Sequence, residues 1–144
     1  MSVSDADCGK SAVKIVLVNG CFDVLHAGHV AHLKQARAMG DRLIVSLTLD
    51  HAVNKGPGRP VNHWGDRAAT LRELRSVDGI VPTENAVYAI LRVRPDIFVK
   101  GIDYAAGDKF TEDIAAACKE VGAELRYTDT PKMSATEIIR RAMV

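Results

Sequence analysis

His26 and His29, which are separated by Ala-Gly, are the residues of this chain best suited to bind a charged ligand. They close the segment 19–29, which reads Asn-Gly-Cys-Phe-Asp-Val-Leu-His-Ala-Gly-His. An apolar run precedes this segment and a helical pattern follows it, so we expect a strand-to-helix turn. The amides and the dipole at a helix start attract anions, and each imidazole could donate to a phosphate oxygen. Because Gly28 would let a phosphate or a flat base approach, the segment predicts a polyphosphate site.

Three other interpretations of this segment compete. Any glycine-containing turn before a helix has a similar composition. His26, His29 and His32 could bind a metal, but positions i and i+6 face different directions on a helix. No cysteine or carboxylate stands at a ligand spacing nearby, so we predict no metal held by the protein. The dinucleotide-binding pattern Gly-x-Gly-x-x-Gly does not follow the strand, which argues against that kind of Rossmann site.

The elements that would hold this turn alternate between strand and helix. We predict strands at 13–18, 42–48, 79–82, 96–100 and 124–128, and helices at 30–39, 66–75, 84–94, 111–121 and from 134 onward. Such alternation implies right-handed crossovers and a parallel sheet. The fold class is therefore α/β, a single Rossmann-like domain with a parallel sheet of about five strands and helices on both faces.

Polar residues follow three of the predicted strands. Asn19 follows the first strand, Asp50 and Lys55 follow the second, and residues 100–104 follow the fourth. Ligands of such sheets bind beyond the carboxyl ends of the strands, so these residues should lie together. The loop 49–61 contains Gly-Pro-Gly and few apolar anchors. We expect it to be mobile without ligand and to close over bound phosphates.

The composition limits the classes of function. The 144 residues suffice for one domain, which we place at 12–144 after a flexible leader at 1–11. A formal net charge of +1 argues against nucleic acid as a partner, and no apolar run has the length of a membrane span. The three cysteines are irregularly spaced and the first residues lack a signal segment. We therefore expect no disulfide framework and a cytoplasmic location.

The sequence resembles the HxGH nucleotidyltransferases, which are the cytidylyltransferase-like family. Five segments carry the resemblance in the family's order, namely 19–29, 40–45, 59–62, 99–104 and 134–139. Within the family, the similarity is greatest to the adenylyltransferase domain of ADP-heptose synthase. Glycerol-3-phosphate cytidylyltransferase is less similar, because the arginine that the cytidylyltransferases have upstream of the last segment is missing from 128–131.

The resemblance implies transfer of a nucleotidyl group from a nucleoside triphosphate, expected to be ATP, to a sugar phosphate, expected to be heptose 1-phosphate. It also implies Mg²⁺ that accompanies the triphosphate, and a homodimer. An acceptor phosphate is largely a dianion at pH 7, so the reaction needs cations and donors more than a general base. A CTP-dependent enzyme for glycerol 3-phosphate and a non-catalytic nucleotide-binding module are the alternatives.

The residue types and the resemblance together define the predicted site. The predicted catalytic residues are His26, His29, Lys55 and Arg67. The predicted nucleotide-binding residues are Asn19, Gly20, Cys21, Phe22, Asp23, Gly28, Lys100, Gly101, Asp103, Met133, Ser134 and Thr136. The residues predicted to bind the second substrate are Asp23, Asp50, Arg59, Arg67 and Lys100.

The start of the last helix has a structural and a functional interpretation. Ser134 and Glu137 form the pattern of a capping box, with Met133 and Ile138 as a hydrophobic staple. The resemblance implies that this helix start also binds nucleotide phosphates. Ala135 replaces a threonine of the family, and Glu137 would place a carboxylate near the phosphates, so both residues argue for weaker phosphate binding.

Overall fold

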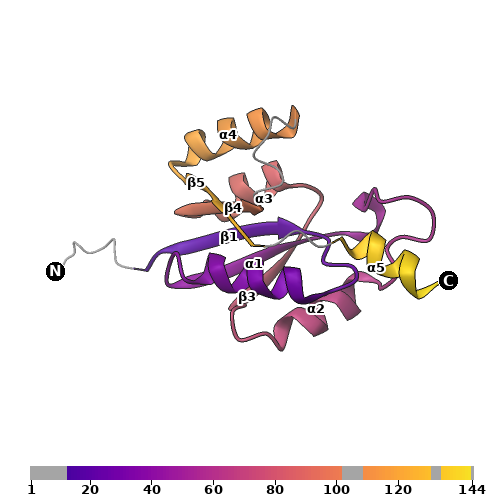
Figure 1. Ribbon diagram of the computed structural model, residues 1–144. Coiled ribbons are helices and arrows are strands. Elements are labelled where there is room, and N and C mark those ends of the chain that lie inside the picture. The colour runs from indigo at the N-terminus through magenta and orange to yellow at the C-terminus, as the bar shows by residue number, and fades with distance from the viewer. Residues whose placement is uncertain (1–12, 102–108, 131–133, 144) are drawn as a thin grey trace.

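Five parallel strands form one sheet in the computed structural model, which describes residues 13–101, 109–130 and 134–143. The strands are β1 (Ile15–Gly20), β2 (Arg42–Thr48), β3 (Gly79–Thr83), β4 (Ile97–Gly101) and β5 (Glu124–Thr128). Their order across the sheet is β3-β2-β1-β4-β5, and every neighbouring pair is parallel (Figure 1). The predicted α/β class with a five-stranded parallel sheet is confirmed.

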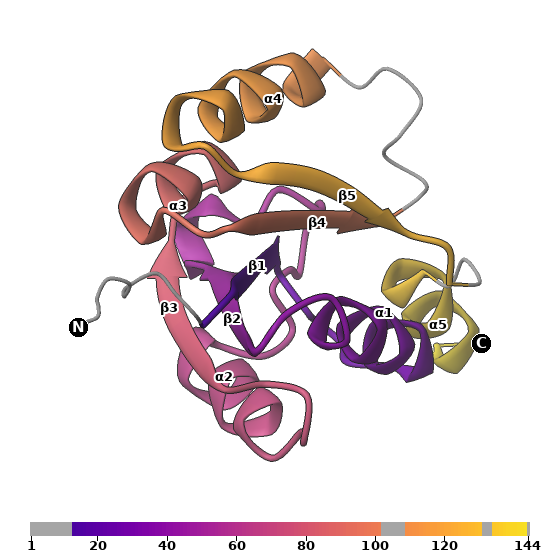
Figure 2. The ribbon, with the colours of Figure 1, turned by 90° about the vertical axis from the view of Figure 1, so that its left-hand side faces the viewer.

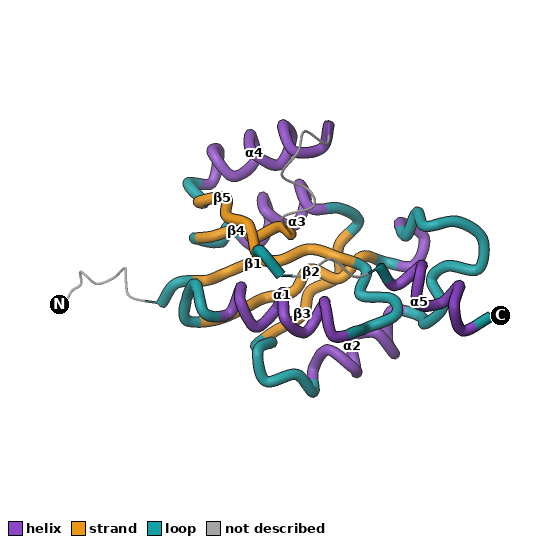
Figure 3. Tube along the Cα trace, viewed as in Figure 1, coloured by secondary structure: helices purple, strands orange, loops and turns teal. Residues whose placement is uncertain are grey.

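Helices cover both faces of this sheet. They are α1 (Ala27–Arg37), α2 (Trp64–Arg72), α3 (Ala86–Val93), α4 (Lys109–Val121) and α5 (Ala135–Ala142), with a short 3-10 turn, η1, at Asp50–Ala52. Figure 2 shows α1 and α2 on one face and α3 and α4 on the other. In the tube of Figure 3, as in Figure 1, α5 lies beyond the carboxyl ends of the strands. Within the described residues, no helix combines the length and the hydropathy that a bilayer crossing requires.

The apolar strands supply a core on each face of the sheet. Because successive side chains of a strand point to opposite faces, Val16 and Val18 pack with the cluster under α1 and α2, whereas Leu17 packs with the cluster under α3 and α4. Leu17 and Phe98 are almost completely buried. Each such side chain stabilises the fold by about 2 kcal/mol.

Some element boundaries differ from the prediction. β1 continues to Gly20, because Asn19 and Gly20 still pair with Ser46 and Leu47 of β2. The helix expected at 30–39 begins three residues earlier, because the side chain of His26 caps it. The leader 1–11, Asp103 and Met133 lie outside the described residues.

Three aspartates bind backbone amides at the amino ends of the strands, opposite the carboxyl ends, where the predicted site lies. Each accepts a hydrogen bond of 2.8 Å from a backbone amide: Asp41 from Lys14, Asp78 from Leu43 and Asp96 from Ile15. These contacts satisfy donors at the start of the strands. A substitution at the amino ends of the strands can therefore change the stability of the fold without altering the residues at the carboxyl ends.

Candidate functional site

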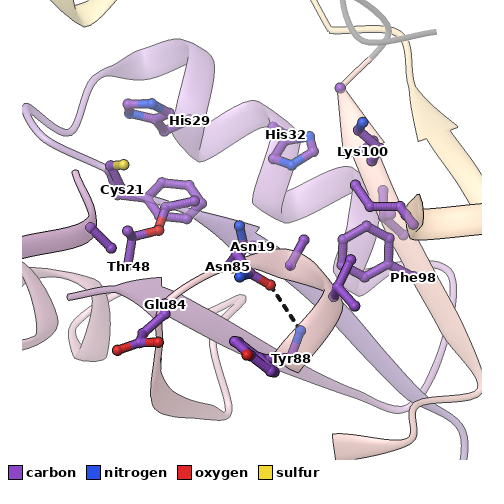
Figure 4. A pocket seen from close by; sticks show the side chains of 18 of the residues that line it. Asn19, Cys21, His29, His32, Thr48, Glu84, Asn85, Tyr88, Phe98 and Lys100 are labelled. Atoms are coloured by element: carbon purple, nitrogen blue, oxygen red, sulfur yellow. Dashed lines mark hydrogen bonds between the residues drawn. The ribbon is translucent and has the colours of Figure 1, made fainter. Parts of the chain in front are cut away.

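A cavity of about 1050 Å³ opens at the carboxyl ends of β1 and β4 (Figure 4). The chain builds β2 and β3 on one side of β1 and then β4 and β5 on the other, and ligands of open α/β sheets bind at such a switch point. Most predicted site residues line the cavity: Asn19, Gly20, Cys21, Phe22, Asp23, His26, Gly28, His29, Lys55, Lys100, Gly101, Ser134 and Thr136. Asp50, Arg59 and Arg67, which were also predicted, are not among the described residues that line it.

His26 and His29 cap the first turn of α1 reciprocally. The Nδ1 atom of His26 accepts from the amides of Gly28 at 3.1 Å and His29 at 3.4 Å. The Nδ1 atom of His29 accepts from the amide of His26 at 3.3 Å. The two rings stack with their centroids 3.8 Å apart. The sequence suggested that the amides of this helix start face the ligand; instead, two of them face His26.

This capping fixes which nitrogen of each ring carries the proton. A neutral imidazole has one N–H donor and one acceptor nitrogen. Since Nδ1 is the acceptor in both rings, Nε2 carries the proton in both. The Nε2 atom of His26 is buried and has no hydrogen-bond partner within the described part of the chain. Such an orphaned buried donor is the kind of group that a bound anion would satisfy.

Burial keeps these histidines neutral. The pKa of His29 is lowered to about 3, first by burial and then by electrostatic repulsion from Lys55 and from His26 and His32 when those rings are protonated. Burial also lowers the pKa of His26. Near pH 7 both rings are therefore neutral donors, and the positive charge of the cavity comes from lysines. Lys55 lines it from the loop after β2 and Lys100 from the end of β4.

Phe22 supports His29 from within the turn. Its ring is nearly buried and meets the ring of His29 edge-on, with centroids 5.0 Å apart. Phe22 has a positive φ of 47°, and a Cβ atom at Gly20 would lie 2.8 Å from its ring. A side chain at Gly20 would therefore displace the ring of Phe22 and remove its edge-on contact with the ring of His29.

Asp23 holds the end of the loop after β2 against the turn. One carboxylate oxygen accepts from the amide of Asn62 at 2.9 Å, and the other from the amide of Val61 at 2.6 Å and from Arg59 Nε at 3.2 Å. Burial alone would raise the pKa of Asp23, but the two amides and the guanidinium hold it below its usual value. Its predicted role as a direct ligand competes with these contacts, because the carboxylate already accepts three hydrogen bonds.

Arg67 connects the turn after β1 to the loop after β2. Its buried guanidinium donates to the carbonyl of Asn62 at 2.9 Å, to the carbonyl of Cys21 at 2.9 Å and to Asp50 Oδ1 at 2.6 Å. Burial would raise the pKa of Asp50, but Arg67 and then His63 lower it. Arg67 was predicted to touch the phosphates or the second substrate; in this structure its guanidinium contacts the turn after β1 and the loop after β2.

The start of α5 borders the cavity. Ser134 caps the helix, since its hydroxyl accepts from the amide of Glu137 at 3.2 Å. The other half of the predicted capping box is not formed among the described residues, because the Glu137 carboxylate accepts from Arg140 at 2.8 Å. Ser134, Ala135 and Thr136 line the cavity. The carboxylate expected to oppose the phosphates is thus paired with its own helix.

Several lining residues were missed by sequence reasoning. His32 lines the cavity, and its Nδ1 lies 2.7 Å from Thr128 Oγ1. Its place three residues after His29, on the same helix face, was the available signal. Glu84 and Asn85, at the end of β3, line another wall, where Asn85 caps α3 by accepting from the amide of Tyr88 at 3.0 Å (Figure 4). Their position at a strand end could have indicated them.

Residues 17–141 match a protein family described as cytidylyltransferase-like. The chain is similar to the bifunctional protein HldE of Pseudomonas syringae pv. tomato, with 43% identity over an alignment of 143 residues that covers 96% of this chain and 29% of that protein. It is also similar to the bifunctional protein HldE of Ectopseudomonas mendocina, with 46% identity over 92% of this chain and 28% of that protein. The chain thus spans less than a third of the length of these relatives.

Solved structures share the fold at lower identity. The lipopolysaccharide core biosynthesis protein from Thermoplasma volcanium superposes with a TM-score of 0.71 at 24% identity, covering 84% of this chain and 100% of that one. TmcAL from Thermotoga maritima, solved with alpha-thio ATP, has a TM-score of 0.65 at 14% identity, covering 90% of this chain and 50% of that one. These two similarities establish the fold alone.

Proposed function

The chain belongs to the cytidylyltransferase-like family of nucleotidyltransferases, and we propose that it transfers an adenylyl group from ATP to heptose 1-phosphate and releases pyrophosphate. The observation that carries the proposal is the pair of neutral Nε2–H donors at the switch-point cavity, one of which is buried without a partner among the described residues. The choice of donor and acceptor rests on the resemblance to the adenylyltransferase domain of ADP-heptose synthase. The 43% identity to a bifunctional HldE protein supports that choice.

The chemistry matches the residues of the cavity. An oxygen of the acceptor phosphate attacks the α-phosphorus, and the bond from that phosphorus to the bridging oxygen breaks as pyrophosphate leaves. A phosphate monoester has a second pKa near 6, so the attacking oxygen needs no base at pH 7. Negative charge grows on the departing pyrophosphate. Donors fixed in advance at that position lower the barrier, and we assign this role to His26 and His29.

The remaining predicted residues divide into those that face the ligand and those that hold the site. Lys55 and Lys100 line the cavity and would offset the charge of two polyanionic substrates. The backbone of the turn at Asn19, Gly20 and Cys21 would lie beside the nucleotide. Arg67 acts through the carbonyl of Cys21, which it fixes.

Magnesium fits this site as a partner of the triphosphate. The described residues contain no cluster of three or more His, Cys, Asp or Glu side chains able to hold a metal, and the Asp23 carboxylate already accepts three hydrogen bonds. Oxygens of the triphosphate and water would therefore supply the ligands, as Mg²⁺ commonly prefers. When bound there, the ion offsets part of the phosphate charge.

Pyrophosphate release tests the proposal directly. ATP, CTP, GTP and UTP are each combined with heptose 1-phosphate, glycerol 3-phosphate and a hexose 1-phosphate, with Mg²⁺ present. We expect the highest kcat/KM with ATP and heptose 1-phosphate. Preference for CTP and glycerol 3-phosphate would establish the alternative substrate pair, and nucleotide binding without release by any pair would contradict catalysis by this chain.

A further inference from the structure

Arg59 is not among the described residues that line the cavity, but it joins two residues that do. Its Nη1 donates to Thr136 Oγ1 at 3.0 Å, its Nε donates to Asp23 Oδ2 at 3.2 Å, and its Nη2 donates to the backbone carbonyl of Asp23. Asp23 belongs to the turn after β1 and Thr136 to the first turn of α5, and both line the cavity. The Arg59 side chain is only 6% exposed. One guanidinium thus connects parts of the site that are 113 residues apart (136 − 23).

We propose that Arg59 is a positioning residue that fixes Thr136 as a hydrogen-bond donor to the bound triphosphate, a role that rests on the proposed function. A hydroxyl has one proton to donate and two lone pairs that accept. Since Arg59 occupies a lone pair of Thr136 Oγ1, the proton remains for another acceptor. Within the described part of the chain, Arg59 is the hydrogen-bond partner of Thr136 Oγ1, and no acceptor there takes the hydroxyl proton. A charged donor on the oxygen also strengthens the donation by the hydroxyl.

Asp23 makes Arg59 better suited to this indirect role than to direct phosphate binding. The amides of Val61 and Asn62 fix the Asp23 carboxylate, which in turn fixes the planar guanidinium. The charge of Arg59 is therefore largely matched by a buried carboxylate before any ligand arrives. The sequence-based prediction of Arg59 as a substrate ligand becomes a prediction that it acts through Thr136.

A double-mutant cycle tests this coupling. Thr136→Val removes the hydroxyl at nearly constant volume, and Thr136→Ser keeps it. Arg59→Lys keeps a positive charge for Asp23 but lacks the fork that reaches both walls. We expect Thr136→Val and Arg59→Lys each to lower kcat about tenfold, the effect of losing one charge-assisted hydrogen bond. KM for the sugar phosphate should change little, because the lost contact is to the triphosphate.

The double variant distinguishes positioning from plain structural support. If Arg59 acts through Thr136, Arg59→Lys with Thr136→Val should be no slower than the slower single variant. If Arg59 only holds the loop, the two effects should multiply, and this result would overturn the inference. A kcat of Thr136→Val within twofold of wild type would also overturn it, and so would a kcat of Thr136→Ser, which keeps the hydroxyl, as low as that of Thr136→Val.

Two further outcomes have a defined meaning. If the wild type releases no pyrophosphate with any substrate pair, the proposed function fails, and the same cycle is measured on the Kd of a non-hydrolysable triphosphate. If a thermal melt shows that Arg59→Lys does not fold, the comparison of Thr136→Val with Thr136→Ser decides. A lower kcat in Thr136→Val but not in Thr136→Ser supports the inference, and equal kcat values in the two variants overturn it.

Discussion

His26 has two roles that substitution can separate. Its Nδ1 caps α1, whereas its buried Nε2 has no partner among the described residues. His26→Asn should keep the cap, since asparagine is among the best N-cap residues, but it has no donor at the position of Nε2. We expect stability within about 0.5 kcal/mol of wild type and kcat lower by about 10²–10³. Thermal melts and pyrophosphate release measure both quantities.

The matched control at this position is His26→Ala, which removes cap and donor together. It should lose a similar factor in kcat and, in addition, about 1 kcal/mol of stability. An asparagine variant with the kcat of wild type would show that His26 only caps the helix.

The lowered pKa of His29 predicts a particular pH dependence of stability. The ring has a pKa of about 3 in the folded chain against an ordinary value of 6.5. Between these values the unfolded chain binds more protons, so the free energy of unfolding falls as the pH decreases. The slope for one fully linked proton is about 1.4 kcal/mol per pH unit. The stabilising effect of a neutral His29 is therefore complete above pH 6.5 and is lost on acidification toward pH 3.

His29→Gln isolates this effect from the titration of carboxylates. Glutamine at the third helical position can still serve the amide of the N-cap, as in a capping box, but it does not titrate. Denaturant unfolding from pH 8 to pH 4 should show a constant difference between wild type and variant above pH 7. Below pH 6 the wild type should lose stability faster than the variant. Parallel curves over the whole range would contradict a buried neutral imidazole.

At the scale of elements, the start of α5 combines a cap with a wall of the cavity. Ser134 Oγ accepts from the amide of Glu137, and Ser134 lines the cavity. Ser134→Ala should lower stability by about 1 kcal/mol and raise the nucleotide Kd. Ser134→Asp should keep the stability, because aspartate caps as well as serine, but its charge would repel phosphates and raise the Kd further. Thermal melts paired with nucleotide titrations test both variants.

The aspartate variant decides between the two interpretations of this helix start. If it melts and binds nucleotide as the wild type does, the start of α5 is structural only. The site would then be confined to the turn after β1 and the loops after β2 and β4.

The loop after β2, predicted to be mobile without ligand, is held by contacts at both of its ends. Asp23 fixes its end at Val61 and Asn62, and η1 forms at its beginning. Between them, a Cβ atom at Gly56 or Gly58 would meet nothing within 4 Å, and Lys55 is exposed. We expect cleavage after Lys55 by a lysine-specific protease to slow when a non-hydrolysable triphosphate is bound. An unchanged cleavage rate at saturating nucleotide would argue against closure of this segment.

At the scale of the whole molecule, the fold followed from the sequence more fully than the site did. Strand and helix patterns in alternation leave few arrangements, because crossovers are right-handed and parallel strands need both faces covered. The contacts of Arg59 and Arg67 were not predictable in this way. They reach partners 36 and 46 residues earlier in the chain, and such pairings depend on the path of loops. The early start of α1 was missed because histidine is not among the preferred N-cap residues.

The cavity takes residues from β1, β4, α1, α5 and the loop after β2, so a ligand there should stabilise the molecule as a unit. A ligand that binds only the folded chain at a concentration of 100 times its Kd adds about 2.7 kcal/mol, which corresponds to a rise in Tm of about 8 °C for a chain of this length. We expect ATP with Mg²⁺ to produce this rise in differential scanning calorimetry.

Asp96→Ala is the control. It removes the acceptor for the amide of Ile15 at the amino ends of the strands, so it should lower Tm without ligand and keep the full rise in Tm on addition of ATP. His26→Asn should melt as the wild type does without ligand and show a smaller rise in Tm than the wild type at the same ATP concentration, because one contact to the phosphates is lost. The opposite pattern would be a full rise in Tm with ATP in His26→Asn and no rise in Asp96→Ala. It would place the nucleotide away from the turn after β1.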